Sequence, residues 1–584
     1  MGIKKEAFDL LREWCDTLIG YTIEIDTPYL NGSILCPACS IVHGRIGDLV
    51  LPLTYLYRET KDGKYLDAAK KYVAWSEFNL VREDGTYHND VGSTWKGISA
   101  FSGLAIGETL EHFSDIIDES TRLSWEATFR RLAYSCAEYF DSPRFTPVIN
   151  YYAGAAAFFA LAYRYFGDEM FLDKARAWEA RCHDAFDENG LLVGEGYGDR
   201  IKPLTESKHI LGIMSDKGCR PIDMGYNLEE SIQLLIMHSV WLGDEELIRY
   251  YTERAKSHIH FILPDGAIDN TFGSRHNKWT YWGSRTSDGL QEGFVLVAKG
   301  EPLIARACLE NIRLYRRCTH NGALYAGLMC HSEGEPACIH HAFTHAKALA
   351  AFCLFADEAD YEDCESTPFP RETDGVKSFQ NGNVITVTRG GFIATVNAFD
   401  GIRYDEADNG GGAISMLYHK KYGAILAATP HKYVPVEPLN MQYLRHTDKT
   451  QCQTPRFVSE DRTYFSDIDR SVELKADGYK VSATSRECDF TAEYDFTEDG
   501  ITVTVTSGVN GTYYLPVISE CTDEFTHDGN TVTFRELLTV TADELSTELY
   551  HGRRFFNQIG GFQYVRVRIP VKANTPTVFT IKIK

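Results

Sequence analysis

Three segments that lie far apart in the sequence carry the residues with the clearest chemical potential. The first holds His88 and Trp95, the second (TPVINYYAG) holds Asn150 and Tyr151 where a helical pattern starts, and the third (IDMGYNLEES) holds Tyr226. An asparagine amide donates hydrogen bonds to a carboxylate, whereas tyrosine and histidine transfer protons. If the fold brings these segments together, they could neutralise an acid group and move a proton beside it.

A fourth segment, DGAIDNTFGSRHNKWTYWGSRTSDG, is the most polar and aromatic stretch of the chain. It contains Arg275, Trp279, Trp282 and Arg285. Aromatic rings stack on the apolar faces of sugars, and the arginine fork binds a carboxylate through two hydrogen bonds. We therefore expect these four side chains, together with Trp95, to bind an acidic sugar. A packed structural loop is the alternative.

One short motif has the spacing of a partial metal site. The segment CPACSIVHGR places Cys36, Cys39 and His43 in a C-x2-C-x3-H pattern. Zinc needs a fourth ligand, and the sequence has no second C-x2-C pair to supply it. We expect a partly buried loop here and predict neither a metal site nor a cofactor, while a divalent cation such as calcium or zinc stays open. The remaining cysteines are expected to be buried free thiols.

The elements that must position these residues form an internal repeat. A glycine turn between two helices is followed, 22 or 23 residues later, by a second loop centred on glycine. The pairs are Gly63 and Gly85, Gly167 and Gly190, Gly243 and Gly266, and Gly300 and Gly322. Each interval holds one helix of about four turns. Helical hairpins bury their apolar faces only against each other, and the uneven unit spacing favours a closed ring over a solenoid.

The sequence pattern changes near residue 370. Before about residue 365 apolar residues recur at helical spacing, whereas after the acidic, proline-containing segment DEADYEDCESTPFPRETDG they alternate with period two. The sequence therefore predicts a multi-domain fold, α then β. An N-terminal (α/α) incomplete toroid is expected over residues 1–368, and a C-terminal antiparallel β-sandwich over residues 374–584.

Composition narrows the range of partners. The chain has 82 acidic and 59 basic residues and a formal net charge of -23. This excess argues against nucleic acid or an anionic membrane, which would need a basic face. There is no apolar run of about 18 residues that would span a membrane. The first residues predict an amphipathic helix and not a signal peptide, so a cytoplasmic location and a periplasmic or secreted one with the signal removed both stay open. The oligomeric state is not predicted.

The order of the two parts and several segments resemble a known group of enzymes. The segments are CPACSIVHGRIGDLVLPLTYLY, TPVINYYAG, IDMGYNLEES, GSRHNKWTYWGSRTSDG and NAFDGIRYDEADNGGGAISMLYH. Over essentially the whole chain they resemble the heparinase II/III-like polysaccharide lyases, which include rhamnose–glucuronate lyases. The resemblance implies β-elimination at a uronate, here glucuronate, with exo action on rhamnose–glucuronate ends as one form.

The resemblance also implies roles for individual residues. A donor must neutralise the uronate carboxylate, a base must remove the C5 proton and an acid must protonate the leaving oxygen. Asn150 matches the neutralising residue and Tyr226 the acid or base. His88 is the candidate for the other proton transfer, and Tyr151 lies beside Asn150. Related lyases place a catalytic histidine early in the β domain, but RYDEADNGGG has none there and offers Tyr404 as a substrate-binding residue.

Two other classes of function stay open from the sequence. Helical toroids also carry unsaturated glucuronyl hydrolases, and Asp223, Glu230, Asp269 and Asp288 could supply the carboxylate pair of a hydrolase. A carbohydrate-binding protein without catalysis is the third class. Elimination creates a conjugated double bond that absorbs in the far ultraviolet, whereas hydrolysis creates none, so the product distinguishes the first two classes.

Overall fold

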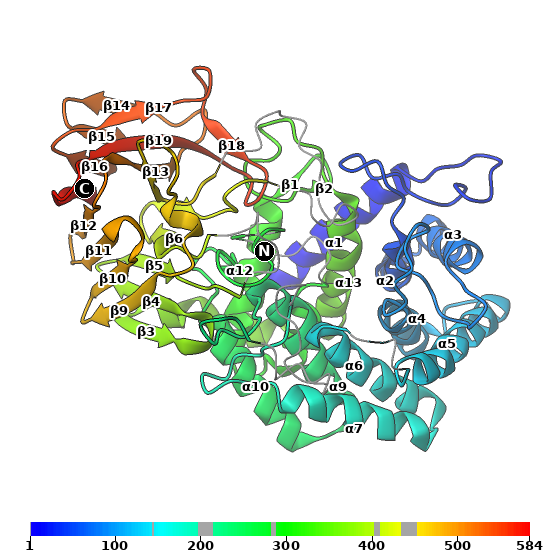
Figure 1. Ribbon diagram of the computed structural model, residues 1–584. Helices are drawn as coiled ribbons and strands as arrows, with labels where there is room; N and C mark the ends of the chain where they lie inside the picture. The colour runs from blue at the N-terminus through cyan, green and yellow to red at the C-terminus, as the bar shows by residue number, and fades with distance from the viewer. Residues whose placement is uncertain are drawn as a thin grey trace.

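The computed structural model describes residues 2–142, 145, 147–196, 214–278, 280–281, 288–401, 409–433 and 452–584. In these residues, helices form the N-terminal part and antiparallel strands the C-terminal part (Figure 1). This order confirms the predicted fold class. The last long helix ends at Phe355 and the first strand of the large sheets begins at Gly375, so the predicted division falls in the short turns between them. No helix among the described residues is both long and apolar enough to cross a membrane.

Six mostly buried helices form an inner ring. They are α2 (Val50–Thr60), α4 (Ser99–Phe113), α6 (Ile149–Phe166), α9 (Gln233–Leu242), α11 (Gln291–Phe294) and α13 (Ile339–Phe355). Each packs against the next along the chain, and α13 packs against α2, so the first and last members meet at a seam. These helices have apolar side chains all round and not only along one face. Each inner helix is therefore buried on all sides.

The outer layer consists of helices with one buried and one exposed face. They are α1 (Ile3–Gly20), α3 (Gly63–Asn79), α5 (Glu119–Tyr139), α7 (Glu169–His183), α10 (Glu245–Ile259) and α12 (Pro302–Arg317). The glycine turns of the repeat lie between inner and outer helices. At Gly243 the backbone is left-handed (φ 67°), and Asp244 then caps α10 by accepting the N–H groups of Glu246 and Leu247.

The second loops of the repeat share one structure. Each contains a short antiparallel pairing, and each glycine has a positive φ between 75° and 83°. At Gly266 an added Cβ would lie 2.1 Å from the carbonyl oxygen of Glu310 on α12, so only glycine fits. The other three glycines lie against side-chain hydroxyl groups on the outer helices, which are Ser135 on α5, Ser257 on α10 and Thr17 on α1. Each hairpin is therefore supported by a neighbouring outer helix, and the last returns to α1.

The described residues of the C-terminal part form two five-stranded sheets and one eight-stranded sheet. The first sheet is β3 (Gly375–Phe379), β4 (Val384–Arg389), β5 (Phe392–Asn397), β6 (Ala413–His419) and β7 (Gly423–Ala427), in that order. The second is β17 (Ser546–Glu548), β19 (Phe562–Val571), β13 (Gly511–Ile518) and β8 (Arg456–Ser459), with β18 (Phe555–Asn557) paired to β19.

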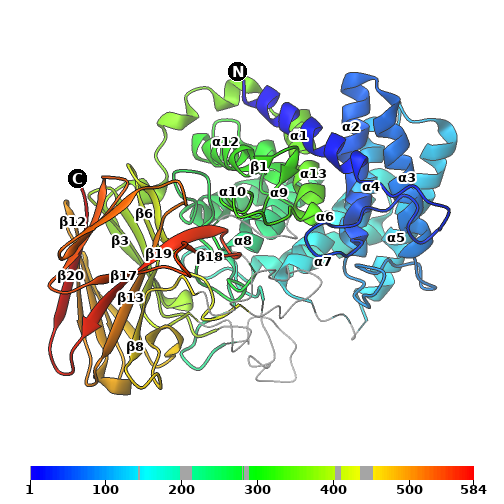
Figure 2. The same cartoon turned by 90° about the horizontal axis from the view of Figure 1, so that it is seen from above.

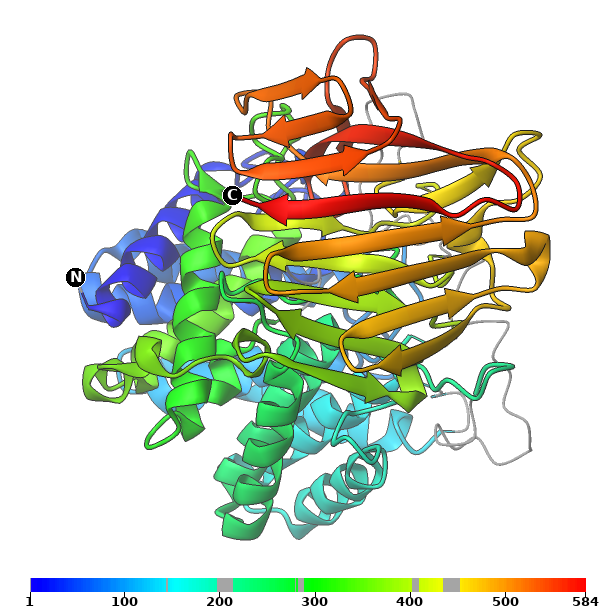
Figure 3. The same ribbon diagram turned by 90° about the vertical axis from the view of Figure 1, so that its left-hand side faces the viewer.

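The eight-stranded sheet forms the outermost layer. Its order is β14 (Phe525–Asp528), β15 (Thr531–Phe534), β16 (Leu538–Ala542), β20 (Thr577–Ile583), β12 (Gly500–Thr506), β11 (Thr491–Phe496), β10 (Lys480–Thr484) and β9 (Glu473–Asp477). It faces the viewer in Figure 3, with the helices behind the β part. Its inward side chains share one apolar core with those of the five-stranded sheets, which makes the β part a sandwich.

Strands β4–β7 of the first sheet are mostly buried on both faces, whereas the edge strand β3 is mostly exposed. Ala394 and Leu417 point into the sandwich core, whereas Ile393, Met416 and Tyr418 join the core of the helical part. Such two-sided burial explains why the strand sequences are nearly continuously apolar. Figure 2 shows the β part lying directly beside the helices. The two parts are therefore fixed together by a shared hydrophobic core.

Candidate active site

Asn150 lies in the first turn of α6, and its side chain is 3% exposed. Its Nδ2 donates a hydrogen bond to Glu230 Oε2 at 2.9 Å, and its backbone N–H donates to Glu195 Oε2 at 3.3 Å. Its Oδ1 is buried and has no hydrogen-bond partner among the described residues. The amide therefore holds an acceptor atom that no described residue uses.

Tyr226 ends the short helix α8 (Met224–Tyr226), which Asp223 caps by accepting the backbone N–H of Tyr226 at 2.9 Å. The chain continues into a π-helical turn, η3 (Asn227–Ile232), which contains Glu230. Single π turns are rare and often occur at functional sites. The motif IDMGYNLEES thus places a tyrosine and a buried glutamate on adjacent turns.

Arg275 connects these residues. Its guanidinium lies 4.5 Å from the ring centre of Tyr226, and its Nη1 is 3.3 Å from Glu195 Oε1. The ammonium of Lys278 lies 5.6 Å from the same ring centre. Because Glu195 also accepts the backbone N–H of Asn150, three residues singled out from the sequence belong to one buried group. We refer to Asn150, Glu195, Tyr226, Glu230 and Arg275 as the Asn150 cluster.

A buried charge network lies behind the Asn150 cluster. Arg45, in the turn η1 (Gly44–Leu49), pairs with Asp48 and Asp288, and its Nη1 is 3.7 Å from Glu230 Oε1. Lys347 on α13 lies 3.1 Å from Asp288. Arg45 and Lys347, which lie on opposite sides of the seam, thus share the carboxylate of Asp288. The charge network therefore joins the first and last parts of the ring.

In this network the pKa values of two carboxyl groups, Glu230 and Asp288, are shifted in opposite directions. Burial raises the pKa of Glu230 well above its ordinary value, and the nearby Asp288 adds to this shift, while Arg45 opposes it. Burial would also raise the pKa of Asp288, but Arg45 and Lys347 together hold that pKa below its ordinary value. Of the two carboxyl groups, Glu230 is therefore the one that holds its proton more strongly.

Aromatic residues pack beside Asn150. The ring of Tyr151 meets Trp95 edge-on at 4.9 Å and Phe101 at 5.6 Å. Burial raises the pKa of Tyr151. Tyr151 consequently keeps its phenolic proton, as a general acid must.

The contacts described for His88 lie within its own loop. Its backbone N–H donates to Leu80, and burial together with the cations Arg82 and Lys96 lowers its pKa. The loop reaches the Asn150 cluster through Trp95, so the role of His88 stays a prediction. Four predicted substrate-binding residues lie outside the described part of the chain, and their roles also stay predictions. They are Trp279, Trp282, Arg285 and Tyr404.

The carboxylates considered for a hydrolase serve different purposes. Asp223 caps α8, and Asp269 pairs with Arg371 at 2.7 Å at the junction with the β part. Glu230 and Asp288 share Arg45, as described above. Asp223 and Asp269 thus hold the structure together, which leaves them poorly suited to act on a substrate.

Sequence reasoning assigned no role to several residues of this region. Glu195 is the single acidic residue of the glycine-rich loop LLVGEGYG, and Lys347 is the single charged residue of the apolar segment HAKALAAF. An isolated charge in an apolar segment is itself a signal, because such groups are buried only when they are paired. Arg45 is a weaker signal than Glu195 or Lys347, because its segment contains a second charged residue, Asp48.

Comparison with solved structures identifies the fold. Heparinase III superposes with a TM-score of 0.51 at 12% identity, covering 91% of this chain and 75% of that chain. The chondroitin AC lyase of Streptomyces coelicolor A3 superposes with a TM-score of 0.54 at 11% identity, covering 99% and 79%. At these identities the likeness shows the fold alone. It is the fold of polysaccharide lyases that combine a helical toroid with an antiparallel β domain.

Comparison of sequences identifies the family. Residues 11–372 match the ulvan lyase N-terminal domain, and residues 376–477 match the ulvan lyase C-terminal domain. The broad-specificity ulvan lyase of Formosa agariphila is 32% identical over 608 residues, covering 97% of this chain and 92% of that protein. The chain belongs to the ulvan lyase family. It is a carbon–oxygen lyase that acts on polysaccharides, which confirms the predicted class and argues against the hydrolase and the non-catalytic binding protein.

Proposed function

We propose that this lyase cleaves an acidic polysaccharide at a uronic acid by β-elimination. Ulvan, which contains uronic acids, is the proposed substrate, because the family takes its name from it. Glucuronate is the proposed sugar, with exo action on rhamnose–glucuronate ends as one form. The observation that carries the proposal is the Asn150 cluster, in which an amide, a protonated carboxyl and a phenol with a cation over its ring lie together.

The first chemical requirement is neutralisation of the sugar carboxylate. The C5 proton of a uronate is far too weakly acidic to leave unless the carboxylate accepts the developing charge. Protonated Glu230 can donate its O–H to Asn150 Oδ1, the unused acceptor, if the amide rotates by about 180°. The two N–H groups of Asn150 then point away from Glu230 and can donate to the substrate carboxylate. This rotation also explains why a protonated glutamate is buried here.

The second requirement is a pair of proton transfers. Tyr226 is proposed as the base, because its phenol belongs to the Asn150 cluster and has the cations Arg275 and Lys278 over its ring. It takes the C5 proton, the bond from C4 to the leaving oxygen breaks, and a double bond forms between C4 and C5. Tyr151 then gives its proton to the leaving oxygen, with His88 as the alternative donor.

The proposal is tested by the product. Incubation with ulvan and with other uronate polysaccharides should give far-ultraviolet absorbance that grows in proportion to new chain ends. A neutral polysaccharide without uronate is the control and should give neither signal. New reducing ends without absorbance would mean hydrolysis and would contradict the proposal. The size of the first products distinguishes exo from endo action.

The raised pKa of Glu230 predicts how the activity depends on pH. Its raised pKa means that the proton is present at lower pH and lost as the pH rises through that pKa, after which its charge repels the substrate carboxylate. Glu230→Gln keeps the hydrogen bonds of the protonated form, so we expect kcat/KM within roughly tenfold of the parent at neutral pH. The decline at high pH that Glu230 causes should disappear in this variant.

The matched control is Glu230→Leu, which has similar volume and no polar atom. We expect it to lose much more activity than Glu230→Gln across the whole pH range. Profiles of kcat/KM against pH for the three proteins provide the measurement. Equal losses in both variants would show that an ionised Glu230 is required and that the assigned protonation state is wrong.

A further inference from the structure

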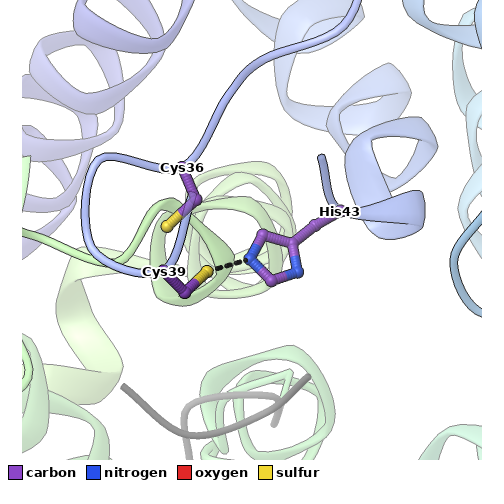
Figure 4. Close-up of side chains that lie close together, drawn as sticks. All are labelled: Cys36, Cys39 and His43. Carbon is purple, nitrogen blue, oxygen red and sulfur yellow. Dashed lines mark hydrogen bonds between the residues drawn. The ribbon is translucent and has the colours of Figure 1, made fainter. Parts of the chain in front are cut away.

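Two cysteines and a histidine gather at the seam of the helical ring. Cys36, Cys39 and His43 come from the segment before η1, and their side chains turn toward one another (Figure 4). Their ligand atoms all lie within 4.8 Å of one another, and all three side chains are buried. The shortest distance, 3.0 Å, joins Cys39 Sγ and His43 Nε2. This is the motif whose fourth partner is missing from the local sequence.

The fold supplies a fourth group from the other side of the seam. Cys338 directly precedes α13, and its Sγ lies 3.9 Å from Cys36 Sγ. It also interacts with the thiol of Cys39. In a tetrahedral zinc site with Zn–S near 2.3 Å, two sulfurs lie about 3.8 Å apart, and sulfur and nitrogen about 3.5 Å apart. The 3.9 Å between the sulfurs of Cys36 and Cys338 matches the first value, and the 3.0 Å between Cys39 Sγ and His43 Nε2 is somewhat shorter than the second. The sulfur spacing is far longer than a disulfide bond of about 2.0 Å.

The surroundings of His43 orient it as a metal ligand. Asp90 Oδ1 lies 3.9 Å from His43 Nδ1, and Asp90 is itself held by the backbone N–H of Gly44 at 2.7 Å and by Asn89 at 2.6 Å. At 3.9 Å this carboxylate is beyond hydrogen-bond distance, but it lies on the Nδ1 side of the ring, and Nε2 faces Cys39 Sγ. The ring of His340 stacks on that of His43 at 4.1 Å and restricts its rotation.

We propose that Cys36, Cys39, His43 and Cys338 bind one structural Zn²⁺ ion. Four protein ligands close the coordination shell, so the ion has no open position for a substrate or water. The proposal concerns the stability of the ring and does not depend on the proposed chemistry of the Asn150 cluster.

The chemistry of the thiols supports this assignment. Cys36, Cys39 and Cys338 are all buried, and thiols placed side by side make only weak hydrogen bonds with one another. Zinc replaces the thiol protons and converts the cluster to strongly bound thiolates. By contrast, Cys308 on α12 is a buried thiol outside this cluster, and its neighbours are Tyr361 and Cys364.

The position of the site indicates what the ion would do. Its ligands span 302 residues and join the segment before η1 to the start of α13, where the first and last inner helices meet. Arg45 follows His43 by two residues, and Lys347 lies on α13, so the ion would also fix the two cations that share Asp288. A metal link between such distant segments closes the ring more tightly than packing alone.

Metal analysis of the full chain tests the proposal. Protein produced with added Zn²⁺ and dialysed should contain about one zinc per chain by mass spectrometry. Cys338→Ser should reduce this to less than about a tenth, whereas Cys308→Ser, a buried thiol elsewhere, should retain it. If Cys338→Ser does not fold, the parent protein stripped by a chelator and titrated with Co²⁺ provides the answer, because thiolate coordination gives charge-transfer absorbance.

Specific results would contradict the proposed zinc site. The zinc proposal would be wrong if the parent protein held no zinc and took up neither Zn²⁺ nor Co²⁺ after stripping. Its thermal stability would then also be the same with and without Zn²⁺. A disulfide between any two of the three cysteines, found by peptide mass analysis, would overturn it as well. None of these measurements depends on lyase activity.

Discussion

Tyr226→Phe is expected to lower kcat by about 10³- to 10⁴-fold, because it removes the group that accepts the C5 proton. The substitution deletes one oxygen atom and leaves the ring that packs under Arg275, so substrate affinity should change little. The rate of far-ultraviolet absorbance on a uronate polysaccharide provides the measurement. Tyr163→Phe is the control, since that tyrosine lies at the far end of α6 with its hydroxyl near the exposed Glu169.

A different kinetic pattern would assign Tyr226 another role. A raised KM with unchanged kcat would mean that its hydroxyl binds the sugar equally in the ground state and the transition state. A kcat within about tenfold of the parent would show that another residue is the base. In that case Tyr151 and His88 are the next residues to substitute.

Asn150→Ala is expected to lower kcat/KM by about 10²- to 10³-fold, the loss seen when one donor to a developing oxyanion is removed. Asn150→Asp has the same shape but adds a negative charge facing the substrate carboxylate, so its loss should be larger. The Asn79→Ala variant is the control for loss of a buried amide, because Asn79 Nδ2 donates to a backbone carbonyl within the outer helix α3. Kinetics and thermal unfolding of the three variants provide the measurement.

The ranking of the three variants by loss of activity tests the role of Asn150 as directly as the size of each loss. If Asn150→Asp were as active as Asn150→Ala or more active, the residue would not face a carboxylate. If Asn79→Ala lost as much activity as Asn150→Ala, a general loss of stability would explain both results. Either outcome would contradict the assigned role of Asn150.

The helical repeat could be predicted because its signals are local. Gly243 ends one helix in a left-handed conformation and Asp244 starts the next, and both requirements are visible in two adjacent residues. The convergence of Asn150 and Tyr226 followed from the same repeat, since both lie where helices of the ring begin. Local turn chemistry therefore determined the architecture and the general position of the site.

Features that depend on distant residues could not be predicted. Cys338 follows Cys36 by 302 residues, so no spacing rule connects them, and the motif looked incomplete. Glu230 appeared only as one of several carboxylates, because its protonation depends on burial and on Arg45 and Asp288. Such pairings arise when the ring closes and leave no local trace in the sequence.

The most direct test of the Asn150 cluster is the structure of Tyr226→Phe with a uronate oligosaccharide bound. The account predicts that the sugar carboxylate lies about 3 Å from Asn150 Nδ2, with C5 facing the ring at position 226. Glu230 should then lie on the Oδ1 side of the same amide. A carboxylate bound away from Asn150, or a sugar whose C5 faces away from position 226, would contradict the account.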